Sequence, residues 1–335
     1  MGVPRADGHW GACDKSNKKN CRTRCSALVS KGNNNILIDT SPDLRFQLIR
    51  NKIKNITSVL YSHLHADQTH GINDLRVFFL KNNKKINIYA DEPTLDYFKK
   101  NYSYYFKNGP EYPAILKTNK LKNNFSLGFD SELITFKTIK VKHGKINNIA
   151  YIFKNSAYIS DCNKLSLSNL KELKDLNYFI IDCLRYKKHP SHFSLREVLS
   201  IVKLIKPKQT ILTNLHIDLD YNILLKRLPN NIKPAYDGLR LELWIEKNAY
   251  YRSCHFFLDL HWEEKFNKFD YEFFENVILL LVTNNRIKYP TNADSKDPLK
   301  TPILTPSICS VFSINAKFPT KRLIVNPMPV KIPTP

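Results

Sequence analysis

The chain has 335 residues, 42% of them apolar and 24% charged, which excludes a wholly disordered protein. It contains no apolar run long enough to cross a membrane and no secretory signal at its first residues, and seven cysteines are too few for a disulfide scaffold, so we expect a cytoplasmic protein without membrane contact. The net charge of +22 permits a nucleic-acid partner without requiring one, because a coding sequence rich in A and T also enriches lysine and asparagine.

Short apolar runs alternate with turn signals up to residue 246. The predicted strands cover residues 27–29, 35–39, 58–62, 85–90, 132–141, 149–153, 156–160, 178–182 and 209–213. The predicted helices cover residues 93–101, 165–175, 194–205 and 221–228. The third of these helices has the clearest signals, with Ser194 at the N-cap, Glu197 at the capping-box position and Pro207 just beyond the end. Strands interleaved with helices in this way predict a layered α/β sandwich.

The distribution of glycine and proline predicts where the working domain ends. All nine glycines lie at or before Gly238, whereas nine of the eighteen prolines lie in residues 290–335. A folded domain needs glycine at turns and helix ends. We therefore expect residues 1–246 to form the working domain, residues 247–289 a helical appendage, and residues 290–335 an extended, proline-rich tail without fixed structure.

The densest cluster of metal-binding side chains directly follows the predicted strand 58–62. His63, His65, Asp67 and His70 lie within eight residues of sequence there. Imidazole and carboxylate groups are ligands of zinc and similar metals, and a loop at a strand end can point alternate side chains at one ion. A solvated polar loop rarely gathers so many of these groups. The cluster therefore predicts a metal site.

Three later strands are also followed by a side chain that can bind a metal. His143 comes after a strand that we expect to end at Val141, Asp161 follows the strand 156–160, and Asn214 follows the strand 209–213, with His216 two residues further on. Any one of these residues would be unremarkable by itself. Four strand ends of the same design in one chain favour a shared site.

These motifs resemble a known family. The sequence HLHAD at residues 63–67 resembles the HxHxD signature of the metallo-β-lactamase superfamily, and the order of the later strand ends is similar as well. Four short segments resemble the branch that contains the phosphoribosyl cyclic phosphodiesterases, with ribonuclease Z more distant; they cover residues 2–5, 71–76, 189–194 and 236–238. The resemblance extends over residues 2–244. It implies an α/β fold, a four-layer αβ/βα sandwich with the metal site at one end of two sheets.

The resemblance also implies a ligand set. Residue by residue, His63, His65 and His143 would hold a first metal, with zinc the expected ion. Asp161 would bridge this metal and a second one, and Asp67 would bind the second.

Two departures from the family both fall on the second metal position. Gln68 and Asn214 stand where the family has histidines. Three alternatives follow. The centre holds one metal, or Gln68 and Asn214 serve as oxygen ligands for manganese or magnesium, or His70 and His216 substitute for the lost ligands. We rank the last two together slightly above the first.

The implied reaction is hydrolysis of a phosphodiester by metal-bound hydroxide. His192 matches the position of the general acid in the phosphodiesterase branch, and His189 is the fallback. Asp39, after the strand 35–39, would orient the histidine loop without binding metal. Arg76 and Arg185 are candidates for phosphate contact, because a guanidinium fits phosphate in a bidentate manner.

The N-terminal segment supports two further expectations. Cys13, Cys21 and Cys25 could hold a structural zinc, as a cysteine-rich loop does in the cyclic phosphodiesterases, although the spacing here is wider and a fourth ligand is missing. The family has a first strand and a glycine-rich turn before the segment at residues 2–5, so we expect the start of translation to lie upstream of Met1. Without that strand, its partner strand would be left at an exposed edge.

The residues and the resemblance together favour a metal-dependent phosphodiesterase that acts on a small cyclic or nucleotide-like phosphodiester, and a homodimer is implied by the resemblance alone. A ribonuclease Z-like RNA-processing endonuclease is the alternative that the positive charge would suit. The third interpretation is a degenerate member of the family that has lost its catalytic activity.

Overall fold

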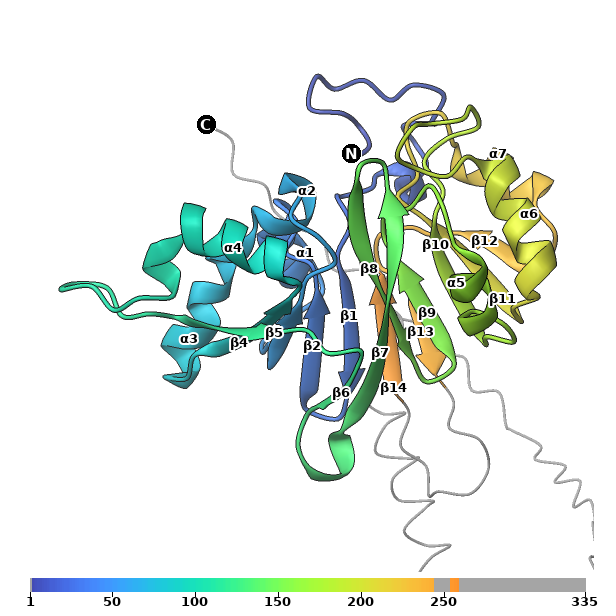
Figure 1. Ribbon diagram of the computed structural model, residues 1–335. Helices are drawn as coiled ribbons and strands as arrows, with labels where there is room; N and C mark the ends of the chain where they lie inside the picture. Colours follow the sequence, from blue (N-terminus) through green and yellow to red (C-terminus); the bar gives the residue numbers. More distant parts are fainter. Residues whose placement is uncertain (1, 244–253, 259–335) are drawn as a thin grey trace, which may run out of the picture. The chain divides into compact units, whose positions relative to one another are not determined.

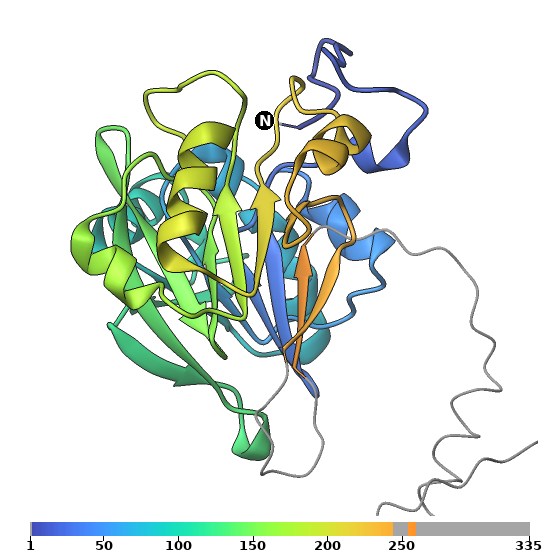
Figure 2. The same ribbon diagram turned by 90° about the vertical axis from the view of Figure 1, so that its right-hand side faces the viewer.

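The computed structural model describes residues 2–243 and 254–258. These residues form two seven-stranded sheets (Figures 1 and 2). The first sheet has the order β13 (Arg240–Leu243), β14 (Cys254–Leu258), β1 (Ala27–Lys31), β2 (Asn34–Ile38), β3 (Ser58–Leu60), β4 (Ile86–Ala90) and β5 (Leu116–Lys120). The second has the order β12 (Ile232–Pro234), β11 (Gln209–Thr213), β10 (Tyr178–Asp182), β9 (Ser156–Ile159), β8 (Ile146–Phe153), β7 (Ile134–His143) and β6 (Asn124–Leu127).

Helices cover the outer face of each sheet, so that the described residues form four layers, as expected (Figure 1). One outer layer contains α1 (Leu44–Arg50), α2 (Ala66–Thr69), α3 (Arg76–Asn82) and α4 (Glu92–Asn101). The other contains α5 (Leu167–Glu172), α6 (Leu195–Ile205) and α7 (Tyr221–Arg227). Single 3₁₀ turns occur at Lys18–Asn20, Ile72–Leu75, Ser103–Tyr105 and Asp130–Glu132.

The two-residue repeat of the strands explains the layers. In β2, Ile36 and Ile38 point into the core between the sheets, whereas Leu37 packs under the helices of the first layer. In β10, Ile180 points into the core between the sheets, whereas Phe179 and Ile181 pack under α5 and α6. Strands that are apolar on both faces read as continuous apolar runs, which is why the sequence showed them clearly.

The central core should carry much of the stability. Ile180 is completely buried between the sheets, so Ile180→Ala should lower the free energy of unfolding by about 2–5 kcal/mol through lost burial and a residual cavity. Denaturant unfolding measures this loss. The matched control Leu204→Ala removes a side chain that is 63% exposed and should change stability by less than about 0.5 kcal/mol. Equal losses in both variants would contradict this packing.

Several sequence predictions are corrected by the structure. β7 extends to His143, so this histidine is the last residue of a strand rather than part of the loop after it. The helix predicted at residues 165–175 is shorter and ends at Glu172. The short helices α1, α2 and α3 and the strands β5, β6, β12, β13 and β14 were not predicted. The capping box of α6 is confirmed, with Ser194 and Glu197 in both of its hydrogen bonds.

The predicted domain boundary at residue 246 also needs correction. Strand β14 lies beyond it and pairs antiparallel with both β13 and β1, so the first sheet includes residues from the segment predicted as a helical appendage. As a result β1 has a neighbour on each side, β14 and β2. The rest of residues 247–289 and the proline-rich tail at 290–335 lie outside the described residues. Among the described residues, no helix combines the length and apolarity needed to cross a bilayer.

Candidate metal centre

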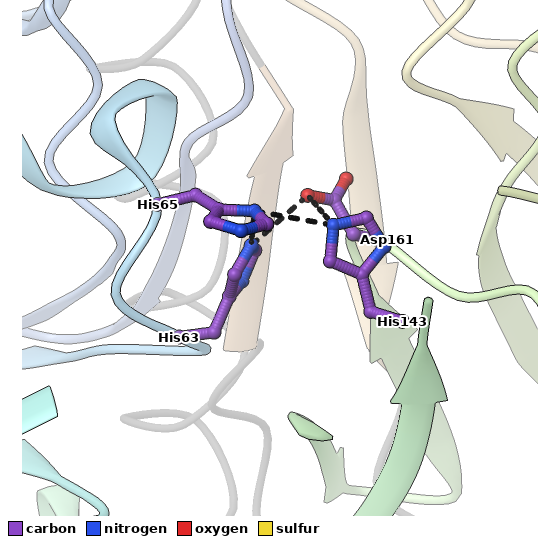
Figure 3. Close-up of side chains that lie close together, drawn as sticks. All are labelled: His63, His65, His143 and Asp161. Carbon is purple, nitrogen blue, oxygen red and sulfur yellow. Dashed lines mark hydrogen bonds and ion pairs between the residues drawn. The ribbon is translucent and has the colours of Figure 1, made fainter. Parts of the chain in front are cut away.

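The carboxyl ends of strands from both sheets meet at one end of the sandwich. The chain leaves β3 and reaches His63 and His65, and the latter is the N-cap of α2. From the second sheet, β7 ends in His143 and the chain after β9 reaches Asp161. Figure 3 shows these four side chains converging from the two sheets. Carboxyl ends of strands are where α/β sheets commonly bind ligands.

The four side chains are close enough to share one ion. Nε2 of His63 lies 2.9 Å from Nδ1 of His65, and Nε2 of His143 lies 3.2 Å from the same atom. Oδ2 of Asp161 lies 3.3 Å from Nε2 of His63 and 3.9 Å from Nε2 of His143. His63, His143 and Asp161 are each at least 96% buried, at 1%, 4% and 1% exposure.

Hydrogen bonds behind the histidines determine which ring nitrogens face the cluster as acceptors. Nδ1 of His143 lies 2.7 Å from the carbonyl oxygen of Ser191, which only accepts, so Nδ1 carries the proton. The Ser62 hydroxyl donates to Oδ2 of Asp39 at 2.7 Å and therefore accepts from Nδ1 of His63 at 3.0 Å. In both rings Nε2 is therefore unprotonated, and its lone pair points at the other ligands.

Converging lone pairs and a buried carboxylate repel one another unless a cation lies between them. Three imidazole nitrogens and one carboxylate oxygen form a donor set typical of zinc and related divalent metals. Hydrogen bonds from the outer ring nitrogens are also typical of histidines that bind metal. The residues present therefore fit a divalent metal at this position.

The protonation of the ligands agrees with this fit. Burial, and then the neighbouring His143 and His65, hold the pKa of His63 well below its usual value. Burial likewise lowers the pKa of His143 to about 4, so both rings are unprotonated at neutral pH, as metal ligands must be. Burial and the nearby Asp182 raise the pKa of Asp161, so its negative charge needs a compensating cation.

Asp182 is a site residue that the sequence analysis missed. It is the last residue of β10 and is fully buried. Its Oδ2 accepts from the Cys162 backbone N–H at 2.9 Å and lies 2.9 Å from Nδ1 of His192. The sequence did indicate this residue, because the predicted apolar strand 178–182 ends in a carboxylate. We assigned Asp182 to the strand and did not consider it as a site residue. Together with Asp161 and His192 it forms a second cluster of potential metal ligands.

His192 lies beside the first cluster, with its ring centroid 4.7 Å from that of His143. Burial by itself lowers the pKa of His192, but the hydrogen bond and the charge of Asp182 outweigh it, so the net pKa is raised. His192 is therefore placed next to the metal ligands as a partly buried imidazole whose protonated form is favoured by Asp182. His189, the fallback, lies further out, with its ring centroid 5.0 Å from that of His192, and its Nδ1 lies 3.3 Å from the Ser191 backbone N–H.

The structure places the residues that we expected at the second metal position in different surroundings. Gln68 and Asn214 both contact Asp161, whereas Asp67 belongs to neither cluster among the described residues. His70 is exposed and its Nε2 lies 3.1 Å from the Tyr97 hydroxyl. His216 faces Asp218 at 3.7 Å.

Neither His70 nor His216 belongs to a group of potential ligands among the described residues, so the geometry does not support them as replacements for the two histidines.

The structure does not bring the other sequence candidates to the metal ligands. The Arg76 guanidinium lies over the Tyr112 ring, and Arg185 donates to the carbonyl oxygens of residues 187 and 188. Among the described residues the three N-terminal cysteines form no metal-binding group. The Cys13 thiol is buried against the Ile217 carbonyl, Cys21 is exposed, and Cys25 lies near Thr213.

Asp39 lies where the sequence analysis expected it to act. It accepts hydrogen bonds from the Ser62 backbone N–H and hydroxyl, both at 2.7 Å, and it reaches His63 only through Ser62.

Asp39→Ala should lower metal affinity about 10–100-fold, because the ring of His63 loses its support. Titration against a competing chelator measures this affinity. Asp7→Ala, which removes an exposed carboxylate paired with Arg5, is the matched control and should leave affinity unchanged. An unchanged affinity in Asp39→Ala would contradict the positioning role.

Comparison with known proteins agrees with this geometry. Residues 34–217 match the Beta-lactamase superfamily domain. A solved structure described as a new diphosphatase from the PhnP family is 29% identical, with a TM-score of 0.65, and the match covers 73% of this chain and 94% of that one. The short form of human tRNase Z is 17% identical with a TM-score of 0.52, over 70% of this chain and 98% of that one, which shows the fold alone.

One curated relative is an octanoyltransferase of Porphyromonas gingivalis, 30% identical over 244 residues. The match covers 71% of this chain but only 48% of the relative, so this chain spans about half of it. The activity in that name is therefore not carried over to this chain. The matched domain, the four-layer fold and the histidine–aspartate cluster together show that the chain belongs to the metallo-β-lactamase superfamily and resembles its PhnP branch.

Proposed function

We propose that this protein is a metal-dependent hydrolase that cleaves a phosphoester bond in a small substrate. One observation carries the proposal. The ligand cluster of His63, His65, His143 and Asp161 lies directly beside a pair formed by the buried Asp182 and the partly buried His192. The first group fits a divalent metal, with zinc favoured by its three imidazoles, and the second is suited to moving a proton.

The chemistry divides between the ion and the protein. When bound, a divalent metal at this site lowers the pKa of water and offsets negative charge on the phosphoryl oxygens. His192 protonates the leaving oxygen from Nε2, because its Nδ1 is engaged with Asp182 at 2.9 Å. Asp182 orients the ring and stabilises its protonated form. Asp182 is fully buried and the His192 side chain is only 15% exposed, so little water weakens these interactions.

The similarity to a diphosphatase supports phosphorus as the reaction centre, since that relative matches over nearly its whole length. Phosphodiesters and diphosphates share a phosphoryl group that bears negative charge and an oxygen leaving group. We therefore propose small phosphodiesters first and diphosphates second as the substrate class.

A substrate panel tests this proposal on the full-length chain loaded with zinc, manganese or magnesium. The panel contains bis(p-nitrophenyl) phosphate, a nucleoside 2′,3′-cyclic phosphate, ADP and a neutral p-nitrophenyl ester. We expect turnover of at least one phosphorus substrate that disappears with a chelator. Turnover of the neutral ester alone would contradict the proposal.

RNA is the second candidate substrate, because the net charge of +22 would favour a polyanion. Salt dependence distinguishes the two. An enzyme that binds RNA through several phosphates loses affinity steeply as the salt concentration rises, whereas an enzyme that acts on a small substrate does not. Binding of a precursor tRNA without cleavage would instead indicate a non-catalytic member of the superfamily.

A further inference from the structure

The second metal position implied by the family resemblance is filled here by side-chain amides. Gln68 and Asn214 stand where the family has histidines, and both lie against the carboxylate of Asp161, one on each oxygen. Nε2 of Gln68 lies 3.1 Å from Oδ2, and Nδ2 of Asn214 lies 2.8 Å from Oδ1. The carboxylate that would bridge two metals is therefore hydrogen-bonded to two amides.

The orientation of the Asn214 amide follows from its surroundings. Its Nδ2 also lies 3.2 Å from Oδ1 of Asp182, so its two hydrogens face two buried carboxylates. The opposite orientation would place the amide oxygen against both carboxylates, which is repulsive. The backbone of Asn214 has a φ of 58°, a left-handed conformation in which asparagine is enriched. Asn214 is thus well suited to this position as a hydrogen-bond donor.

Gln68 reaches Asp161 from α2, the short helix that follows β3 of the first sheet. The side chain is 1% exposed and follows the HLHAD segment on α2. Its Oε1 is buried without a hydrogen-bond partner among the described residues, so it is an oxygen that a second cation could still use.

The balance of charge agrees with a single ion. Asp161 and Asp182 are the carboxylates of the two potential ligand clusters, and both are at most 1% exposed. Because Asp182 pairs with His192 at 2.9 Å, one divalent cation already offsets the charge left on Asp161. Asp67, the remaining second-metal ligand of the family pattern, lies outside both clusters among the described residues.

We propose that the centre is mononuclear, and that Gln68 and Asn214 are positioning residues which hold Asp161 by hydrogen bonds where a second metal would otherwise bind. This inference rests on the proposed metal-dependent function. It differs from the expectation that amide oxygens or the nearby histidines rebuild the second site.

Metal content tests the proposal without reference to activity. The full-length, tag-free chain is stripped with a chelator, equilibrated with excess zinc or cobalt, and desalted, and bound metal per chain is measured by mass spectrometry. Cobalt absorption is titrated in parallel. We expect one ion per wild-type chain and a spectrum that saturates at one equivalent. Gln68→His/Asn214→His should bind two ions, and Gln68→Ala/Asn214→Ala should still bind one.

Each other outcome has a defined meaning. Two ions in the wild type would overturn the proposal, and a fall to one ion in the double alanine variant would in addition make the amides ligands. A double histidine variant that folds by circular dichroism yet binds only one ion would overturn the role assigned to the amides. If that variant does not fold, the comparison of wild type with the double alanine variant decides. No bound ion in the folded wild type would overturn the proposed function as well.

Discussion

His192→Ala should slow hydrolysis of a nucleoside 2′,3′-cyclic phosphate by about 10²–10⁴-fold, the usual contribution of a positioned general acid. The same variant should lose far less activity on bis(p-nitrophenyl) phosphate. An alkoxide leaving group needs a proton from His192, whereas p-nitrophenolate leaves without one. Steady-state kcat values on the two substrates measure this difference.

The partner of His192 supplies a control for this prediction. Asp182→Asn keeps the shape of the side chain but removes the charge that orients and stabilises the protonated ring, 2.9 Å from Nδ1. It should show the same dependence on leaving group at smaller amplitude. His70→Ala, at an exposed histidine outside the cluster, should change neither rate. Equal losses on both substrates in His192→Ala would show that this histidine does not act as the acid.

His143→Ala should remove the metal and reduce turnover by roughly 10³-fold or more, since the ion supplies several kcal/mol of transition-state stabilisation. The variant loses one of three imidazole ligands and opens a gap beside His65, which lies 3.2 Å away. Metal content after desalting and kcat on bis(p-nitrophenyl) phosphate are the two readouts. Full metal content with normal activity would contradict the ligand assignment.

The same variant should separate metal binding from folding. A bound ion stabilises the native chain by about 4 kcal/mol when present at 1,000 times its dissociation constant, provided that the unfolded chain does not bind it. Zinc should therefore raise the melting temperature of the wild type but not that of His143→Ala. Without metal the two proteins should melt more nearly together, because removal of the ring also removes a repulsive contact between ligands.

Local signals were enough to predict most central strands and the helix α6. The strands are continuous apolar runs, and the start of α6 is encoded by Ser194 and Glu197 within four residues. The strand β14 could not be predicted in this way. Its place next to β1 depends on pairing between Ala27 and Leu258, which are far apart in sequence, and local patterns do not encode such pairing.

The candidate site shows the same limit. The sequence indicated His63, His65, His143 and Asp161, because each follows or ends an apolar strand, and the structure brings them together. For the second metal position, we ranked a rebuilt site slightly above a single metal from the sequence, without knowing the contacts of Asp161. That ranking depends on which groups contact Asp161, and the contacts of Asn214 with Asp161 and Asp182 join three strands of the second sheet.

The most direct test of the account is hydrolysis of bis(p-nitrophenyl) phosphate by the full-length chain before and after metal removal. The wild type should be active, lose activity when stripped with a chelator, and recover it when a divalent metal is returned. His65→Ala, which removes the ligand contacted by both His63 and His143, should stay inactive throughout. Activity that survives metal removal, or that His65→Ala retains in full, would contradict the assignment of this cluster as a catalytic metal centre.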